Sequence, residues 1–235
     1  AQATIEANDI EGSDNTDTGI AVDESGTNDA PTIDIIGGSV NNTATGIDAT
    51  SDIGDFLNIT DVELTNVTSV GIDTGTNNFD GTGSEILSID GATITGDASV
   101  VAIDIDDTNA DVDIQNTDIT DVNDGVDITG AADYNLTSVT VETVDTGNAI
   151  NLDDGTNDPS TLESITIDNA SGATGIRVNG GVDLDVVDSS VNDTNLGIDV
   201  AAAGSFLNVS NTDITNSCLL DTSDAADDCI TAVAE

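Results

Sequence analysis

Residues 184–214 decide the fold. They read L-D-V-V-D-S-S-V-N-D-T-N-L-G-I-D-V up to Val200, A-A-A-G-S-F up to Phe206, and then L-N-V-S-N-T-D-I. Leu184 and Val186 alternate with Asp, which is typical of a strand with one apolar face. Leu207 and Val209 repeat this pair 23 residues later. A period of about 20 to 50 residues indicates a solenoid or a related repeat array.

Two sequence marks recur along the whole chain. The first is Gly or Ala followed by an apolar residue, usually Asp, and a second apolar residue. Its copies begin at Gly19, Gly46, Gly71, Ala102, Gly125, Ala149, Gly175 and Gly197, and Cys218-Leu219-Leu220 is a degraded ninth copy. The second mark is an apolar pair five residues apart: Ile5/Ile10, Ile35/Val40, Ile59/Leu64, Ile89/Ile94, Ile114/Ile119, Leu136/Val141, Leu162/Ile167, Val186/Val191 and Val209/Ile214. Units of about 22 to 31 residues suit one coil each of a parallel β-helix.

The pattern resembles the parallel β-helix repeat of the pectate-lyase-like superfamily, of the type found in extracellular adhesins and surface filaments. Isoleucine-rich runs such as residues 116–120 and 197–200 carry this resemblance, which covers nearly the whole chain. It implies an all-β chain, a single right-handed parallel β-helix of three short strands per coil and about nine coils. That fold hosts lyases, hydrolases, adhesins and passive spacers, so the resemblance alone assigns no function.

Composition agrees with a β-solenoid. The chain has no Met, Trp or His, 2% aromatic residues and 23 Gly. Low aromatic content and high charge would favour disorder, but the apolar periodicity is too regular for a disordered chain. Like residues are expected to stack on one another about 4.8 Å apart in successive coils. We therefore expect one domain, residues 1–235, with a continuous core.

The chain is strongly acidic. Its 47 Asp and Glu against one Arg give a formal net charge of −46. This charge disfavours binding to nucleic acid and to anionic membranes. The Asp of the repeated motif predicts an acidic ladder up one face, formed by Asp48, Asp73, Asp104, Asp127 and Asp199. Salt, bound divalent cations or raised carboxylate pKa values must offset the repulsion. Calcium binding and adaptation to a saline habitat both remain open.

A turn motif recurs as S-G-T-N-D-A-P-T at residues 25–32 and D-G-T-N-D-P-S-T at residues 154–161. The first copy is similar to linkers between cadherin-like repeats of large bacterial adhesins, where Asn and Asp ligate Ca²⁺. The resemblance implies Asn28 and Asp29 as Ca²⁺ ligands, and the internal match adds Asn157 and Asp158. A tight polar turn without metal fits the same residues.

The two cysteines, Cys218 and Cys229, enclose ten residues. Without His or a second thiol pair, zinc binding and thiol catalysis are disfavoured. We expect a disulfide that staples a terminal coil at residues 217–235. A disulfide implies an oxidising compartment, so we expect a secreted, extracellular or cell-surface protein. The start of the chain, without Met or an apolar leader, fits a mature secreted form.

Catalysis finds little support in the sequence. Polysaccharide lyases on this fold use Arg or Lys as the base, and hydrolases use Asp with supporting cations or His. Arg177 is the one cation, and we expect it to pair with Asp of adjacent coils. Tyr134, Phe56, Phe79 and Phe206 are predicted at loop positions, too scattered for sugar stacking. The protein is therefore not expected to be an enzyme.

We see no cap at either end of the predicted solenoid. An open end exposes backbone groups and apolar side chains. The hypothesis is a secreted structural subunit that stacks head to tail into a filament or surface layer, its last coil meeting residues 1–11 of the next copy. The alternatives are a stalk or adhesin segment of a cell-surface protein and, less favoured, a polysaccharide-binding or polysaccharide-cleaving β-helix. Glycans remain possible partners through sequons at Asn41, Asn58, Asn66, Asn135, Asn169, Asn192 and Asn208.

Overall fold

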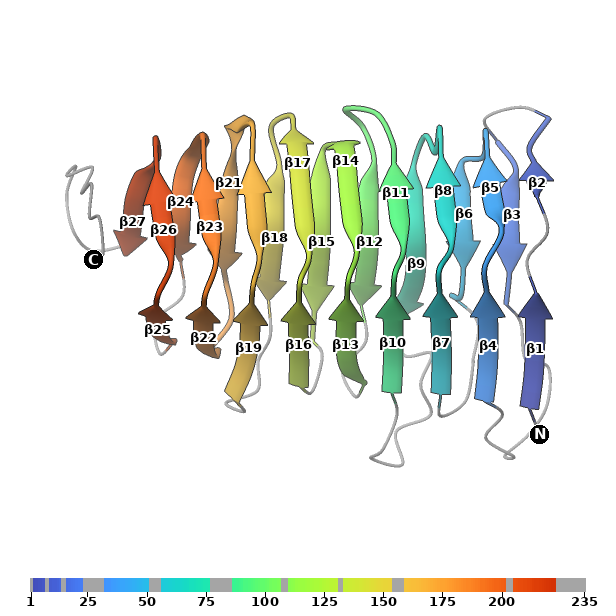
Figure 1. Ribbon diagram of the computed structural model, residues 1–235, viewed down its shortest axis with the longest axis horizontal. Helices are drawn as coiled ribbons and strands as arrows, with labels where there is room; N and C mark the ends of the chain where they lie inside the picture. Colours follow the sequence, from blue (N-terminus) through green and yellow to red (C-terminus); the bar gives the residue numbers. More distant parts are fainter. Residues whose placement is uncertain are drawn as a thin grey trace.

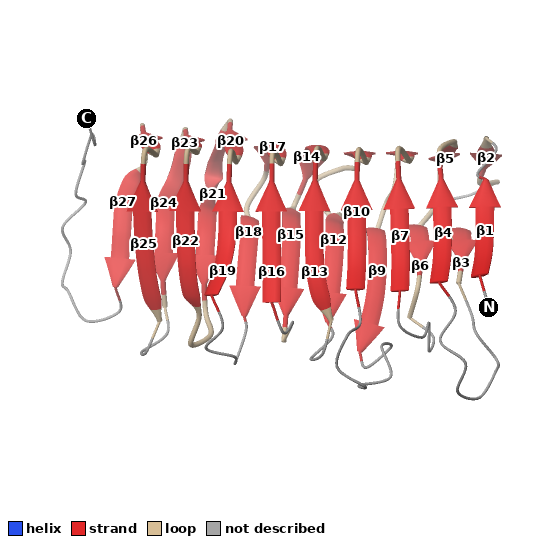
Figure 2. Cartoon of the chain, turned by 60° about the horizontal axis from the view of Figure 1, so that its bottom comes forward, coloured by secondary structure: helices blue, strands red, loops and turns tan. Residues whose placement is uncertain are grey.

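A computed structural model shows an all-β chain built from three parallel sheets (Figure 1). The structure describes residues 2–6, 9–13, 16–22, 32–50, 56–76, 86–106, 110–130, 133–153, 159–201 and 205–222. Strands are the only regular elements within these ranges (Figure 2), and no helix there could cross a membrane. Each sheet has nine strands, one from each coil.

We call the three sheets A, B and C, and in every coil the chain passes through them in this order. Sheet A comprises β1 (Gln2–Glu6), β4 (Thr32–Ile36), β7 (Phe56–Thr60), β10 (Ile86–Asp90), β13 (Asp111–Gln115), β16 (Asp133–Thr137), β19 (Pro159–Glu163), β22 (Asp183–Val187) and β25 (Phe206–Ser210). Sheet B comprises β2 (Ile10–Glu11), β5 (Ser39–Asn41), β8 (Glu63–Thr65), β11 (Thr93–Thr95), β14 (Asp118–Val122), β17 (Thr140–Val144), β20 (Thr166–Asp168), β23 (Ser190–Asn192) and β26 (Asp213–Thr215). Sheet C comprises β3 (Thr18–Ala21), β6 (Thr45–Asp48), β9 (Val70–Thr76), β12 (Val101–Asp106), β15 (Asp124–Thr129), β18 (Asn148–Asp153), β21 (Ala170–Val178), β24 (Thr194–Val200) and β27 (Cys218–Thr222).

The coil is right-handed. In Figure 1 the chain rises through sheets A and B at the front, returns downward through sheet C behind them, and advances from right to left. Crossover connections between parallel strands take this hand because of the twist of the strands. The structure confirms the expected right-handed parallel β-helix.

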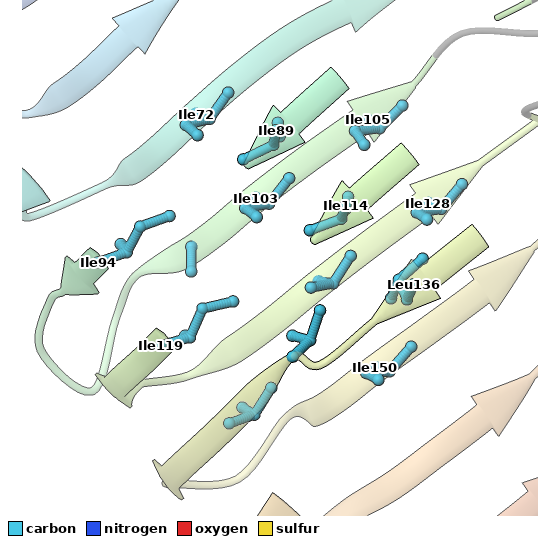
Figure 3. Packing of buried hydrophobic residues seen from close by; sticks show 14 of the residues in the cluster. Ile72, Ile89, Ile94, Ile103, Ile105, Ile114, Ile119, Ile128, Leu136 and Ile150 are labelled. Carbon is cyan, nitrogen blue, oxygen red and sulfur yellow. The ribbon is translucent and has the colours of Figure 1, made fainter. Parts of the chain in front are cut away.

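Like residues stack on like residues, as the repeat predicts. The first members of the apolar pairs form one column in sheet A, in which Ile35, Ile59, Ile89 and Ile114 are completely buried. The second members form a column in sheet B. Sheet C supplies the third column (Figure 3), where Ile103 and Ile105 of β12 point toward the same interior. Each buried aliphatic side chain contributes about 1.5–3 kcal/mol, so the core accumulates coil by coil.

The corners of each coil depend on residues that tolerate a left-handed backbone. One residue after each sheet-A strand from β4 onward has positive φ: Gly37, Asp61, Gly91, Asn116, Ser138, Ser164, Asp188 and Asn211. A second such column lies at the ends of the sheet-B strands, before the chain enters sheet C: Asn42, Asn66, Asp121, Thr143, Asn169, Asp193 and Asn216. Gly, Asn and Asp adopt this conformation more readily than other residues. The frequent Asn and Asp residues between the apolar runs therefore shape the corners.

Thr143 is the β-branched residue in the second corner column, whose other members are Asn or Asp. Its φ is 59°, a conformation that β-branched residues rarely adopt. We expect Thr143→Asn to raise the free energy of unfolding by about 1 kcal/mol, because Asn relieves this strain. Urea denaturation of both proteins measures the change. Thr93→Asn, an exposed strand position, is the control and should give no gain. Equal effects at the two positions would contradict the explanation.

The prediction that the aromatic residues lie in loops is wrong for three of the four. Phe56 begins β7, Phe206 begins β25, and Tyr134 lies within β16. Tyr134 is completely buried, in register with Val112 on one side and Ser160 on the other. The small Ser160 leaves room for the ring in a column of otherwise aliphatic residues. Phe79 lies outside the described residues.

Candidate functional site

The most distinctive surface is the outer face of sheet C, where the acidic ladder lies. Asp48, Asp73, Asp104 and Asp127 stand in direct register on β6, β9, β12 and β15. Each lies between inward-facing residues, as Asp104 does between the completely buried Ile103 and Ile105. Asn151 and Arg177 occupy the next two positions, and Asp199 resumes the series. The five predicted Asp residues therefore fall in one register column, and the column continues to Asp221 of β27, which the prediction did not include.

Burial and stacking raise the pKa values of the central carboxyl groups. The pKa of Asp104 rises to about 6, first because burial removes water, and then because Asp127, Asp73, Asp106 and Asp124 repel its charge. Burial is also the main cause that raises the pKa of Asp73, with repulsion from Asp48 and Asp106; the Gly75 N–H, 2.9 Å from Asp73 Oδ1, opposes it. Protonation of these carboxyl groups is thus one way in which the charge repulsion within the ladder is reduced.

The pKa of Asp127 is raised as well, again mainly by burial. Repulsion from Asp124, Asp153 and Asp106 adds to this effect, and an opposing hydrogen bond comes from Asn151. The Asn151 amide lies 2.8 Å from Asp127 Oδ1. The amide therefore limits the repulsion at this end of the ladder.

Other carboxylates accept a hydrogen bond from an amide one coil later. Asn58 Nδ2 donates to Asp34 at 2.8 Å on sheet A, and Asn192 Nδ2 donates to Asp168 at 2.8 Å on sheet B. Asn116 with Asp90 and Asn208 with Asp185 repeat the arrangement. An amide in register supplies a donor where a second carboxylate would repel. Asp73, Asp104 and Asp127 instead stack on one another in three successive coils, whereas stacked acidic residues elsewhere, such as Asp111 and Asp133, form pairs.

Arg177 occupies the ladder position before Asp199 and interacts with its carboxylate. Its Nε lies 3.8 Å from Asp199 Oδ2 and donates to Asn179 Oδ1 at 3.0 Å. Asn179 in turn donates to Asn151 Oδ1 at 2.9 Å. The result is a polar chain from Asp127 of β15 to Asp199 of β24, which spans three successive coil-to-coil steps. The expected pairing of Arg177 with Asp of an adjacent coil is confirmed.

Arg177→Asp would extend the ladder by one more carboxylate. We expect it to lower the free energy of unfolding by about 1 kcal/mol at low ionic strength, because this partly exposed ion pair becomes a repulsive one. The loss should shrink in about 1 M NaCl, where the screening length falls to about 3 Å. Thermal unfolding at both salt concentrations measures it. Arg177→Gln is the control with a smaller loss, and a salt-independent loss would attribute the effect to packing instead.

The predicted Ca²⁺ ligands Asn28, Asp29, Asn157 and Asp158 lie outside the described residues. Both pairs fall between a sheet-C strand and the next sheet-A strand, β3 to β4 and β18 to β19. Within the described ranges no three His, Cys, Asp or Glu side chains are arranged to hold a metal ion. The ladder carboxylates stand in single file on a sheet face and offer oxygen from one side, whereas Ca²⁺ takes about six to eight oxygens. Calcium binding stays a prediction about the two loops.

The predicted disulfide is described at one end alone. Cys218 begins β27 and stands in register with Leu196 of β24. Cys229 lies outside the described residues. The pairing of the two thiols therefore stays a prediction.

Two shallow hollows follow the corner between sheets B and C. One, of about 280 Å³, is lined by residues that include Asp121, Thr143 and Asn169. The other, of about 350 Å³, is lined by residues that include Asn42 and Asn66. Short polar side chains dominate both, whereas small-molecule sites are usually lined by apolar and aromatic groups. The corner residues that line these hollows already have a structural role, because their left-handed backbone forms the corner of each coil.

The sequons differ in their exposure. Asn66, Asn135, Asn169 and Asn208 are exposed. Asn41, Asn58 and Asn192 are half-buried, and each donates its amide to an acidic residue of the preceding coil. Sequence reasoning could not separate these two groups, because exposure depends on which residue stands opposite.

No protein-family model, no curated protein and no solved structure matches this chain. Its class, a right-handed parallel β-solenoid with an acidic outer face, is therefore defined by its own register and surface.

Proposed function

We propose that the protein is a secreted structural β-solenoid whose copies stack head to tail into an extracellular filament or surface layer. The observation that carries this proposal is the parallel register of all three sheets through nine strands each, which is interrupted by local shifts at β9–β12 and β21–β24 of sheet C. Backbone hydrogen bonds between parallel strands run along the axis, so nine coils form a stiff rod about 40 Å long. The proposal places the protein with adhesin and surface-filament β-helices rather than with the enzymes of this fold.

The surface chemistry supports a non-enzymatic role. Arg177 is the one Lys or Arg in the sequence, and Asp199 and Asn179 already engage its guanidinium group. A lyase on this fold would need an Arg or Lys side chain that is free to act as the general base. The proposed partner is a second copy of the chain, with no nucleic acid and no membrane insertion, while glycans remain possible at the exposed sequons.

Calcium is the proposed cofactor, held by Asn28, Asp29, Asn157 and Asp158. The net charge of −46 favours any divalent cation that lowers repulsion between coils and between copies. The proposed Cys218–Cys229 disulfide would suit an oxidising, extracellular location. A second candidate function, a stalk or adhesin segment of a cell-surface protein, draws on the same rigid rod and differs in that it needs no self-assembly.

Negative-stain electron microscopy of the purified chain distinguishes these functions. Samples with millimolar Ca²⁺, without added Ca²⁺ and with a chelator are compared. Fibres that fall apart on chelation would support a calcium-dependent filament. Fibres that persist in the presence of the chelator would support the filament and contradict the role of Ca²⁺ as its cofactor. Short rods under every condition would contradict the filament and favour the stalk.

A further inference from the structure

We infer that β25 of one copy pairs in parallel with β1 of the next copy, in the register that continues the core columns of sheet A. This inference rests on the proposed head-to-tail assembly and specifies its interface. The two strands are the opposite edges of the nine-stranded sheet A (Figure 1). A second copy of this chain is therefore the proposed occupant of each edge.

The β25 edge exposes side chains that the repeat places in the core. Val209 belongs to the column of Ile35 and Val186, both completely buried, yet it is 41% exposed. Phe206 on the same strand is 68% exposed, but it stands in register with the outward-facing Asp183, so Val209 is the core position that this edge exposes. An edge strand with apolar side chains and unpaired backbone groups is a template for a further strand. The β25 edge therefore presents one unfilled layer of the same core.

The β1 edge carries the matching side chains. Ile5 begins the column that Val209 ends, so a copy added one coil further places Ile5 against Val209. The same shift places Ala3 against Leu207 and Ile10 against Ile214. Ile5 and Ile10 are half-buried in the single copy, as expected of columns covered from one side. The apolar positions of the two edges thus coincide in one register.

Charge favours the same register. On the outward face Glu6 would stand opposite Ser210, and Glu11 opposite Thr215. Among the described residues of sheets A and B, one like-charged pair remains, Asp9 with Asp213, at the start of sheet B. The described carboxylates of β1 and β2 thus stand mostly opposite neutral residues at this junction, whereas carboxylates stack on one another within sheet C.

The test compares two substitutions of similarly exposed aliphatic residues on sheet A. Val209→Asn places an amide in the proposed junction, whereas Ile36→Asn places one on the outer face of β4, where Ile36 is 45% exposed. Burying an amide without a partner is unfavourable, so the critical concentration for assembly should rise about tenfold for Val209→Asn alone. Circular dichroism verifies that both variants fold. Fibres of Val209→Asn that form at the wild-type concentration would overturn this interface and leave the filament standing; wild-type protein that never assembles would instead overturn the proposed function.

A second measurement remains decisive if Val209→Asn does not fold. Thr4 and Asn208 face outward on β1 and β25, at opposite edges of sheet A in one copy. Across the proposed junction their backbones would lie about 4.8 Å apart. A Thr4→Cys, Asn208→Cys double variant treated with a short bis-maleimide should give a covalent ladder of multimers in preformed fibres. Each single substitution, Thr4→Cys or Asn208→Cys, is the control, because the native Cys218 and Cys229 are present in all three variants. Fibres of the double variant that give no more ladder than these controls would overturn the register.

Discussion

Replacing Gly125 with Val is expected to lower the free energy of unfolding by about 3 kcal/mol, the upper range for overpacking a close-packed interior. Gly125 is a buried residue of β15. A Cβ atom there would lie 2.3 Å from the carbonyl oxygen of Ala149 in the next coil and 2.8 Å from Val141 Cγ1. Because the first contact is with backbone, the side chain can be accommodated only if β15 and β18 separate.

Other glycines of the repeated motif meet the same obstacle. A Cβ atom on Gly46, Gly71 or Gly175 would lie 2.3–2.6 Å from a carbonyl oxygen of the following coil. Ala102 and Ala149 occupy equivalent positions, so Gly125→Ala should be less damaging than Gly125→Val. The requirement for a small residue therefore comes from the distance between coils.

Guanidinium denaturation measures the Gly125→Val effect, with Gly37→Asn as the control. Gly37 has a φ of 66°, which Asn tolerates, and a Cβ atom there would meet nothing within 4 Å. We expect the control to change the free energy of unfolding by no more than about 0.5 kcal/mol. An unchanged midpoint for Gly125→Val would mean that the coils separate more easily than close packing allows.

Asp104→Asn is expected to stabilise the protein at pH 7 by about 1 kcal/mol, because solvent screens part of the repulsion at this half-buried carboxyl group. In the folded chain the pKa of Asp104 is raised from 3.8 to about 6 by burial and by neighbouring carboxylates. A raised pKa means that folding favours the neutral acid. The stability contributed by the neutral form is complete below about pH 4 and is lost as the pH rises through about 6. The amide keeps the neutral form at every pH.

The pH dependence of unfolding tests this explanation. The stability advantage of Asp104→Asn over wild type should appear between about pH 4 and 6 and vanish below about pH 4. The raised pKa values of Asp73 and Asp127 should act in the same direction in the wild-type protein, which becomes more stable on mild acidification. Asp118→Asn removes an equal charge at an exposed site of β14 and is the control. An advantage that persists at pH 3 would refute the protonation mechanism.

The sequence by itself determined the repeat, the three columns and the positions of the acidic ladder. These features depend on alternation and spacing within a single coil, which the chain order displays directly. The pairs Ile35/Val40 and Ile114/Ile119 stand in the predicted columns, and Asp104 stands between Asp73 and Asp127 as predicted.

The tertiary structure decided how each residue meets its neighbour one coil away. Tyr134 follows Gly-Ala-Ala-Asp at residues 130–133 and is predicted in a loop, but the register turns it inward beside Ser160. Asp34 gains an amide from Asn58, whereas Asp104 gains two carboxylates. The coils differ in length because the segments between sheets C and A vary, so sequence distance does not state which side chains face one another. Hydrogen bonds and charge repulsion act between neighbouring coils about 4.8 Å apart. This spacing exists only after the coils have stacked.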